Sequence, residues 1–321
     1  MNGKSAATPR CVAPAGDWTG EGALWDAESQ AVWWVDIGRF LIHRLATATG
    51  DVHTWFFAEP PTAIALTDRP GTFVVALASR VILWQPANDA RSDFARPDID
   101  HPRVRSNDAR ADPTGNFWLG TMQNNVGGDG SDSEIDDHTL GRLYRIASDG
   151  SWTTEKTGIG ISNTVAWSPD KRRFYFGDSL RNVISVWDYD AATGTIANER
   201  PFFAGFERGV PDGSAVDGDG YLWNARYDGN CVVRVAPDGS VDRVIEMPVA
   251  APTTCTFGGP DLKTLYVTSA GGGRGLAKGD QLSGGLFALP VDVPGRSVRA
   301  IAVGGSAKNQ VWTSPVAVAS R

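Results

Sequence analysis

Six polar residues recur at the same position in six strand-like segments of the chain. The segments end just before a turn, at Trp25, Leu66, Ala111, Trp167, Val216 and Phe257. Four residues before these ends stand Glu21, Thr62, Asn107, Asn163, Asp212 and Thr253. Four of the six carry a carboxylate or carboxamide oxygen, the donors that hard cations such as calcium, magnesium and manganese prefer. If the segments surround one axis, these oxygens converge on a single metal ion.

Each of these polar residues also has a simpler structural explanation. Asn and Asp commonly stabilise the turns that precede strands. Pro211-Asp212-Gly213, for example, resembles the ordinary turn Pro237-Asp238-Gly239. Any one of the residues taken alone therefore favours a turn, whereas four at the same phase of a repeat favour a shared site.

The elements that must position these residues are short strands in a repeated unit. Each unit has an apolar strand, a turn rich in Asp, Pro and Gly, and an aromatic-rich strand, as in GALWDAESQAVWWVDI and DGSAVDGDGYLWNARYDG. A second hairpin-like pair follows, such as GRLYRIASDGSW. Six such units predict an all-β fold, a six-bladed β-propeller with about four antiparallel strands per blade and a central channel that holds a metal. A β-sandwich, the simpler alternative, predicts no repeat register.

Length and composition fit one large domain. We expect an N-terminal extension (1–19) that contributes to blade closure, a propeller domain (20–303) and a C-terminal tail (304–321). The net charge of −7 and the absence of a basic run argue against a nucleic-acid partner. No stretch approaches the roughly 20 apolar residues of a membrane span, and the N-terminus lacks an apolar signal segment. We therefore expect a cytoplasmic protein, and no obligate protein partner is evident.

The four histidines do not occupy the repeated position. They are His43, His53, His101 and His138. Their placement argues against a histidine-based zinc site and against a Ser-His-Asp triad. We expect them at the surface or at strand ends.

One long polar segment interrupts the third unit. Residues 123–138, QNNVGGDGSDSEIDDH, are rich in glycine and lack the spacing of a calcium-binding EF-hand loop. We expect a solvated surface loop, with a lid over the channel mouth as the alternative.

Several longer motifs, taken in order, resemble those of a known family. They are Gly20-Glu21-Gly22, NDARADPTGNFWLGTM, ISNTVAWSPD with FGDS, PDGSAVDGDGYLW, CTFGGPDLKTLYVTSA and GGLFALPVD. From about Gly20 to Asp292 the chain resembles the gluconolactonase/regucalcin (senescence marker protein) family of six-bladed propellers. This resemblance implies hydrolysis of aldonolactones with one divalent cation. Calcium is favoured, and zinc, manganese, magnesium or iron are the alternatives.

The resemblance also implies roles for individual residues. Glu21, Asn163 and Asp212 correspond to the metal ligands of the family. Asn107 corresponds to a residue at the edge of the metal that also touches substrate, and Arg105 corresponds to an arginine that binds substrate oxygens.

The chain departs from the family pattern after Met122. Animal members carry acidic residues there that reach the substrate, whereas this chain has Gln123, Asn124 and Asn125. The metal site should survive this change, but the sugar preference is less transferable.

These roles combine into an expected reaction, metal-dependent hydrolysis of a small-molecule sugar lactone to the aldonic acid by a carboxylic ester hydrolase. The metal acts as a Lewis acid, Asp212 as general base, and Asn107 stabilises the oxyanion while Arg105 and Asn125 hold ring hydroxyls. The alternatives are a phosphotriesterase/arylesterase-like propeller hydrolase and a non-catalytic metal-binding propeller. Arg105, which suits hydroxyl-rich or anionic substrates, favours the sugar.

Overall fold

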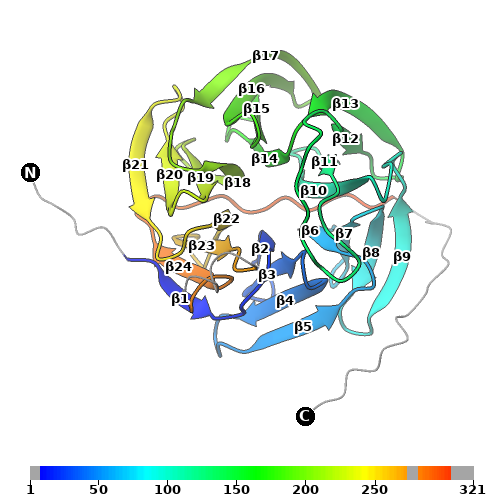
Figure 1. Cartoon of the computed structure of the whole chain (residues 1–321), viewed down its shortest axis with the longest axis horizontal. Helices are drawn as coiled ribbons and strands as arrows, with labels where there is room; N and C mark the ends of the chain where they lie inside the picture. Colours follow the sequence, from blue (N-terminus) through cyan, green and yellow to red (C-terminus); the bar gives the residue numbers. More distant parts are fainter. Residues whose placement is uncertain (1–7, 273–280, 305–321) are drawn as a thin grey trace, which may run out of the picture.

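The computed structural model of the protein describes residues 8–272 and 281–304. It is an all-β ring of six antiparallel sheets with four strands each (Figure 1). The prediction of a six-bladed propeller with four strands per blade is therefore confirmed. The described residues include no helix long and apolar enough to cross a membrane.

The strands follow the chain from blade to blade, and their bounds are as follows. Blade 1 has β2 (Gly20–Asp26), β3 (Ala31–Asp36), β4 (Leu41–Ala46) and β5 (Val52–Phe56), and blade 2 has β6 (Pro61–Leu66), β7 (Phe73–Leu77), β8 (Val81–Gln85) and β9 (Ala90–Ala95). Blade 3 has β10 (Val104–Ala111), β11 (Phe117–Gln123), β12 (Gly141–Ile146) and β13 (Trp152–Ile159), and blade 4 has β14 (Ser162–Trp167), β15 (Arg173–Asp178), β16 (Val183–Asp190) and β17 (Thr195–Ala204). Blade 5 has β18 (Val210–Val216), β19 (Leu222–Tyr227), β20 (Cys231–Val235) and β21 (Val241–Glu246). Blade 6 has β22 (Pro252–Gly258), β23 (Thr264–Ser269), β24 (Leu286–Pro290) and β1 (Arg10–Ala13).

The ring is held together by apolar residues between neighbouring blades. A single twisted sheet cannot bury both of its faces, so the blades pack radially against one another. Between blades 1 and 2, the ring of Trp33 lies 4.6 Å from that of Phe73 and 5.9 Å from that of Trp84, centroid to centroid. Aromatic pairs in this range contribute about 1 kcal/mol beyond the area that they bury.

The N-terminal strand closes the ring. In blade 6, β1 pairs with β24, and Arg10 lies opposite Ala288. The first strand of the chain thus completes the last blade, and the chain then continues into blade 1. The proposed domain bounds of 1–19 and 20–303 are consistent with this pairing but are not tested by it. The predicted tail, apart from Gly304, lies outside the described residues.

After β24, the chain crosses the ring as an extended strap, residues 292–304. Figure 1 shows it as a pale trace across the centre on the far side of the ring. The N–H of Gly218 donates to Pro294 O at 2.8 Å, the N–H of Ile301 to Leu66 O at 2.8 Å, and the N–H of Gly304 to Ser148 O at 2.7 Å. The strap therefore links blades 5, 2 and 3 across one end of the channel.

A β-bulge interrupts every innermost strand at the recurring polar residue. The six shifts in pairing register fall at Glu21/Leu24, Pro61/Ala63, Ser106/Ala109, Asn163/Ala166, Pro211/Ser214 and Pro252/Cys255. A bulge bends its strand and re-aims the side chain beside it. Gly22, with φ of 61°, supplies the left-handed conformation that this bend requires after Glu21.

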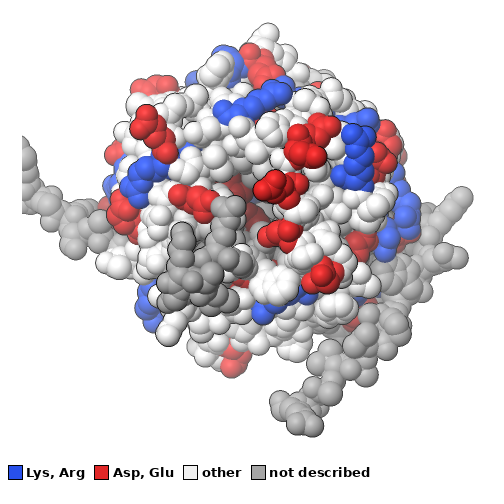
Figure 2. Space-filling model, viewed as in Figure 1, with Lys and Arg blue, Asp and Glu red and all other residues white. Residues whose placement is uncertain are grey.

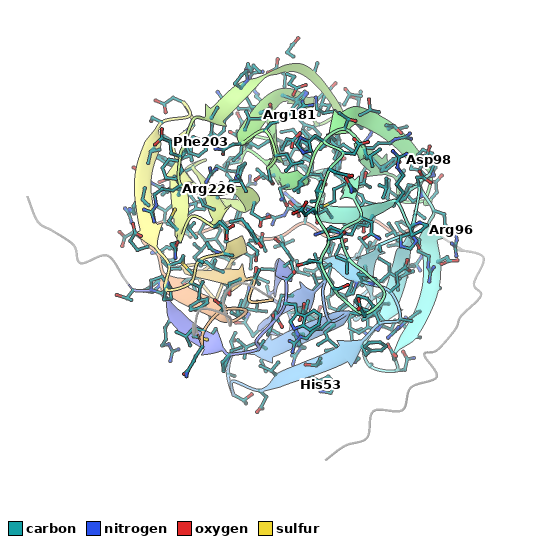
Figure 3. The ribbon with its side chains drawn as sticks, viewed as in Figure 1. His53, Arg96, Asp98, Arg181, Phe203 and Arg226 are labelled. Carbon is teal, nitrogen blue, oxygen red and sulfur yellow. The ribbon has the colours of Figure 1, made fainter. Side chains whose placement is uncertain are left out.

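One expectation about the histidines is wrong. His43 lies inside β4 and is 4% exposed, whereas we expected it at the surface or at a strand end. A hydrogen bond of 2.8 Å joins His43 Nδ1 and Thr54 Oγ1, and His43 Nε2 lies 3.1 Å from Asp17 Oδ1, so the ring has polar partners that make burial acceptable. His53, by contrast, lies at the outer edge of the ring, as Figure 3 shows.

Candidate active site

The structure brings all of the predicted site residues to one cavity at the axis of the ring. Its volume is about 740 Å³, and its walls include Glu21, Arg105, Asn107, Asn125, Asn163 and Asp212. Of the two threonines at the same repeat position, Thr253 lines the cavity as well. Figure 2 shows a hollow at the centre of this face with Asp and Glu side chains beside it, while most Lys and Arg side chains lie toward the rim.

Two carboxyl groups face each other in this cavity. Glu21 begins the first blade and Asp212 the fifth, and their side chains lie within hydrogen-bonding reach of each other. Burial, and then the charge of Asp108, raises the pKa of Glu21 to about 8. Burial, and then the charge of Glu21, raises the pKa of Asp212 well above its usual value. Two ionised carboxylates this close require a compensating positive charge.

Asp108 adds a third carboxylate near this pair. Its side chain is 8% exposed, and its Oδ2 accepts the N–H of Val165 at 3.1 Å, so it is anchored to the next blade. Burial raises the pKa of Asp108. Asp108 stands one residue past the repeated position, so the repeat does not mark it as a site residue.

Asn163 is oriented by a hydroxyl group that the sequence analysis missed. Ser179 Oγ donates to Pro211 O at 2.6 Å, so Oγ is left to accept the hydrogen of Asn163 Nδ2 at 2.9 Å. This hydrogen bond points the amide nitrogen of Asn163 toward Ser179. The carboxamide oxygen, Oδ1, is then available to coordinate a metal ion. Ser179 ends the motif FGDS, but nothing in its residue type or spacing marks it as a support for Asn163.

The backbone of Asp212 is held by two further buried side chains. Thr164 Oγ1 and Asn224 Nδ2 both donate to Asp212 O, and the Asn224 contact measures 2.9 Å. Gly213 follows, where a Cβ would lie 2.0 Å from Thr254 Oγ1. Only glycine fits there. These contacts fix the position from which the carboxyl group of Asp212 enters the cavity.

Arg105 organises the amide groups at one side of the cavity. Its Nη1 donates to Asn107 Oδ1 at 2.7 Å and to Ser106 O at 2.8 Å. Its Nε and Nη2 both donate to Asn125 Oδ1, at 3.1 and 2.8 Å. Because a guanidinium group has five N–H donors, these four contacts leave one Nη2 hydrogen for another acceptor. Burial lowers the pKa of Arg105 to about 10.

The loop 123–138 contributes to the wall of the cavity. Asn125, Val126 and residues 132–135 line it, and Figure 1 shows the loop in front of β10, β6 and β7, beside the centre of the ring. The loop is ordered by its own contacts, including a bridge between Val126 and Asp132. At its tip, a Cβ on Gly130 would lie 2.1 Å from Gly38 O, so the tip rests directly on blade 1.

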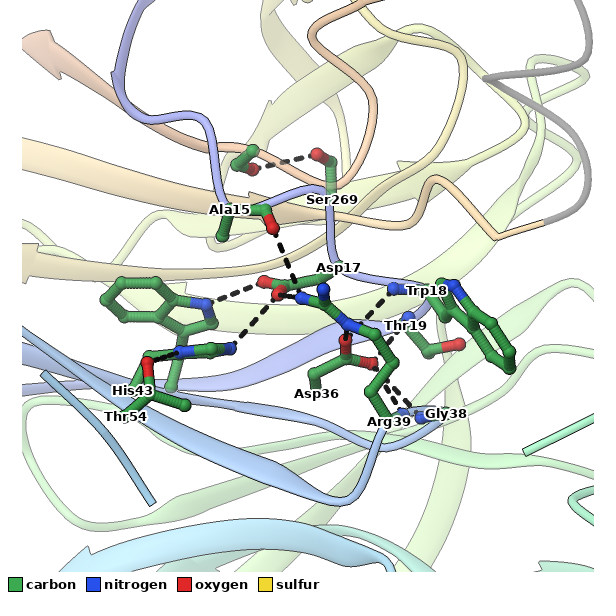
Figure 4. A network of polar contacts seen from close by, with 12 residues as sticks. Ala15, Asp17, Trp18, Thr19, Asp36, Gly38, Arg39, His43, Thr54 and Ser269 are labelled. Carbon is green, nitrogen blue, oxygen red and sulfur yellow. Dashed lines mark hydrogen bonds and ion pairs between the residues drawn. The ribbon is translucent and has the colours of Figure 1, made fainter. Parts of the chain in front are cut away.

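A buried charge network fixes the segment that leads into Glu21 (Figure 4). The carboxylate of Asp36 accepts the N–H groups of Trp18 and Thr19, both at 3.1 Å. Arg39 pairs with Asp36 at 2.5 Å and with Asp17 at 2.8 Å. The network therefore sets where β2 begins and where Glu21 stands.

The donor set of the cavity fits a hard divalent cation. In the described part of the chain, no group of three or more His, Cys, Asp or Glu side chains is arranged to hold a metal. The candidate set instead combines the carboxylates of Glu21 and Asp212 with the carboxamide oxygen of Asn163, a mixture typical of calcium and magnesium sites. A cation at this point would relieve the repulsion between the two carboxylates.

Comparison with known families agrees with this geometry. Residues 19–271 match the model of the SMP-30/Gluconolactonase/LRE-like region. A pentonolactonase, XacC of Haloferax volcanii, is 36% identical over 284 residues, which cover 86% of this chain and 92% of that protein. A 6-deoxy-6-sulfogluconolactonase of Pseudomonas putida is 34% identical, with 90% of this chain and 96% of that protein covered.

Solved structures share the fold. A protein from Agrobacterium tumefaciens, described as a calcium-binding protein, regucalcin, superposes with a TM-score of 0.84 and 28% sequence identity. The match covers 92% of this chain and 97% of that one.

Proposed function

Because the chain belongs to the SMP-30/gluconolactonase/LRE-like family, we propose that it hydrolyses a sugar lactone to the corresponding aldonic acid. Two relatives that match nearly the whole chain are named as lactonases, one for a pentonolactone and one for a 6-deoxy-6-sulfogluconolactone. The observation that carries the proposal is that Glu21, Asn163, Asp212, Asn107, Arg105 and Asn125, although far apart in the sequence, line one cavity. Its volume of about 740 Å³ falls in the usual range for small-molecule sites.

We further propose that Glu21, Asn163 and Asp212 hold one divalent cation. The paired buried carboxyl groups of Glu21 and Asp212 and the oriented Asn163 oxygen support this assignment, as does the calcium-binding description of the Agrobacterium relative. When bound, such a cation supplies Lewis-acid polarisation of the lactone carbonyl. Calcium is favoured, and the oxygen-rich donor set also admits magnesium and manganese.

Asp212 is the general base of the proposed reaction. Its carboxylate takes a proton from the water that attacks the lactone carbonyl carbon. As the ring C–O bond breaks, Asp212 returns this proton to the leaving alkoxide, which yields the open-chain acid. The contacts of Thr164 and Asn224 with the Asp212 backbone hold the base in place during both transfers.

Asn107 and Arg105 bind the substrate. Asn107 Nδ2 donates to Ser162 O at 2.8 Å and makes a longer contact of 3.3 Å with Asn163 Oδ1. A substrate oxygen replaces the longer contact at low cost, so this N–H stabilises the oxyanion. The remaining Nη2 hydrogen of Arg105 binds a ring hydroxyl, and Asn125 is held beside it.

A pH-indicator assay with a panel of lactones tests the proposal. Pentono- and hexonolactones release a proton on hydrolysis, and the protein should turn over at least one of them. Turnover of an organophosphate or aryl ester without any lactone turnover would instead support the related esterase function. Binding of a metal with no turnover of either class would support a non-catalytic propeller.

A further inference from the structure

A second cavity lies at the opposite end of the channel from the proposed active site. The active-site residues stand at the starts of the innermost strands, whereas this cavity is bordered by the ends of β10, β14, β18 and β22. Its volume is about 100 Å³, enough for several water molecules or one small ion. The strap forms its remaining wall with residues 296–299.

Four basic side chains line this small cavity, and no Asp or Glu does. Arg110 ends the innermost strand of blade 3, Lys171 lies in the turn after β14, and Arg296 and Arg299 belong to the strap. This grouping is unusual for a chain with a net charge of −7. Arg299 is exposed and the other three side chains are half-buried, so an anion from solvent can reach all four.

Lys171, Arg296 and Arg299 have no acidic partner among the described residues. None of them forms an ion pair with a carboxylate there, although most other described arginines do or donate to backbone oxygens. The one side-chain hydrogen bond among the four joins Arg296 Nη1 to Ser168 O at 3.4 Å. The charge of Arg110 acts on Asp108, but the two side chains form no ion pair.

A buried donor beside the cavity also lacks a partner. Trp167, which lines the cavity, is 8% exposed, and its Nε1 has no hydrogen-bond acceptor. Buried N–H donors normally find an acceptor in a folded protein. An occupant with several acceptor oxygens would satisfy both this donor and the cations.

We propose that this cavity binds a tetrahedral oxyanion of the phosphate or sulfate class, supplied as the free inorganic anion. Guanidinium and ammonium groups are the side chains that recognise such anions, because they donate charge-assisted hydrogen bonds to several oxygens at once. The cavity volume of about 100 Å³ accommodates such an anion. Because Arg296 and Arg299 come from the strap, a bound anion also fastens the strap to blades 3 and 4.

Calorimetric titration of the full-length protein with inorganic phosphate, at an ionic strength held constant with chloride, tests this site. We expect one saturable site, with Lys171→Gln and Arg299→Gln each weakening phosphate binding about tenfold. Arg172→Gln is the matched control, because it removes the same charge from the same turn without lining the cavity, and it should change the affinity by less than about twofold. No saturable binding to the unaltered protein would overturn the proposal, as would equal weakening by Arg172→Gln.

Two further readouts separate this site from the active site and identify the source of the anion. Lactone turnover should be unchanged in the Lys171→Gln and Arg299→Gln variants. If the variant that carries both substitutions binds phosphate with unchanged affinity, the anion binds elsewhere and the assignment is refuted. A sugar phosphate should bind more weakly than inorganic phosphate. Tighter binding of the sugar phosphate would contradict the assignment to a free anion.

Discussion

The carboxyl groups of Glu21 and Asp212 lie within hydrogen-bonding reach of each other, although they belong to the first and fifth blades. Each side chain is less than a tenth exposed, and after burial the charge of Glu21 is the main cause that raises the pKa of Asp212. A propeller can bring such groups together because the starts of its innermost strands share one axis. The proposed cation and the proposed base both depend on this pairing.

Removal of the proposed base should abolish turnover without unfolding the protein. Asp212→Asn keeps the side-chain volume but cannot accept the proton of the attacking water, so kcat for the preferred lactone should fall about a thousandfold. Circular dichroism should show an unchanged fold. Asp238→Asn, in the similar turn Pro237-Asp238-Gly239 at the surface, is the control and should keep full activity. Near-normal kcat in Asp212→Asn would refute the base assignment.

Ser179 is a positioning residue for Asn163, and its loss should weaken metal binding. Without Ser179 Oγ, the carboxamide of Asn163 can rotate, so Ser179→Ala should lower the metal affinity about tenfold or more. Excess calcium should restore most of the turnover, a rescue that a general loss of structure would not allow. Ser151→Ala, in an exposed turn, serves as the control. The positioning role fails if calorimetry finds an unchanged affinity for calcium.

Metal removal should destabilise the folded protein through the same pair of carboxylates. A ligand that binds only the folded state stabilises it by about 4 kcal/mol at a thousand times its Kd, so chelation should lower Tm. In chelator, Asp212→Asn should be more stable than the unaltered protein by about 1 kcal/mol, since it replaces a repulsive carboxylate with a donor to Glu21. Calorimetric melts with calcium and with chelator measure both effects. The same Tm in both conditions would argue against a metal at this pair.

The tip of the loop 123–138 should control access of substrate to the cavity. Gly130 has φ of 83°, and a Cβ there would strike Gly38 O, so Gly130→Ala must lift the tip from blade 1. We expect KM to rise by roughly an order of magnitude with a smaller effect on metal affinity. Gly128→Ala in the same loop is the control, because a Cβ at Gly128 meets no atom within 4 Å. Equal KM values for the two variants would show that the loop does not act as a lid.

The network that precedes Glu21 should contribute to stability as well as to the site. Asp36 is fully buried and accepts several hydrogen bonds, so Asp36→Asn should lower the free energy of unfolding by about 2 kcal/mol. Asp93→Asn, which disrupts an exposed pair with Arg96, should cost less than about 0.5 kcal/mol. Denaturant titration distinguishes the two. A cost for Asp36→Asn no larger than that of Asp93→Asn would exclude this role.

The fold and the membership of the cavity were accessible from the sequence because both depend on a repeat. Glu21, Asn107, Asn163 and Asp212 stand at the same distance before the turn of their repeat unit. Closure of the ring brings residues at equivalent positions of the units together around the axis. Their roles in binding and catalysis remain proposals.

The supports of the site carry no such repeat. Thr164 acts across a blade boundary, whereas Ser179 and Asn224 hold Asn163 and Asp212 from within the same blade. Serine, threonine and asparagine at such positions are too common to be selected. The bulges that aim the site residues depend on strand pairing, which a single sequence does not reveal. The burial of His43 was not predicted, because its partner Asp17 lies in a segment before the first blade, and the sequence alone does not bring the two together. The strap was missed because residues 292–304 have no strand pattern.

Calcium titration of the metal-free protein, with lactone turnover followed in a pH-indicator assay, shows whether the cavity needs a metal ion for hydrolysis. We expect negligible turnover without metal and recovery that saturates at one calcium ion per chain. Full lactone turnover in metal-free protein would contradict this expectation, and so would a failure of any divalent metal to restore turnover in protein that binds one ion per chain.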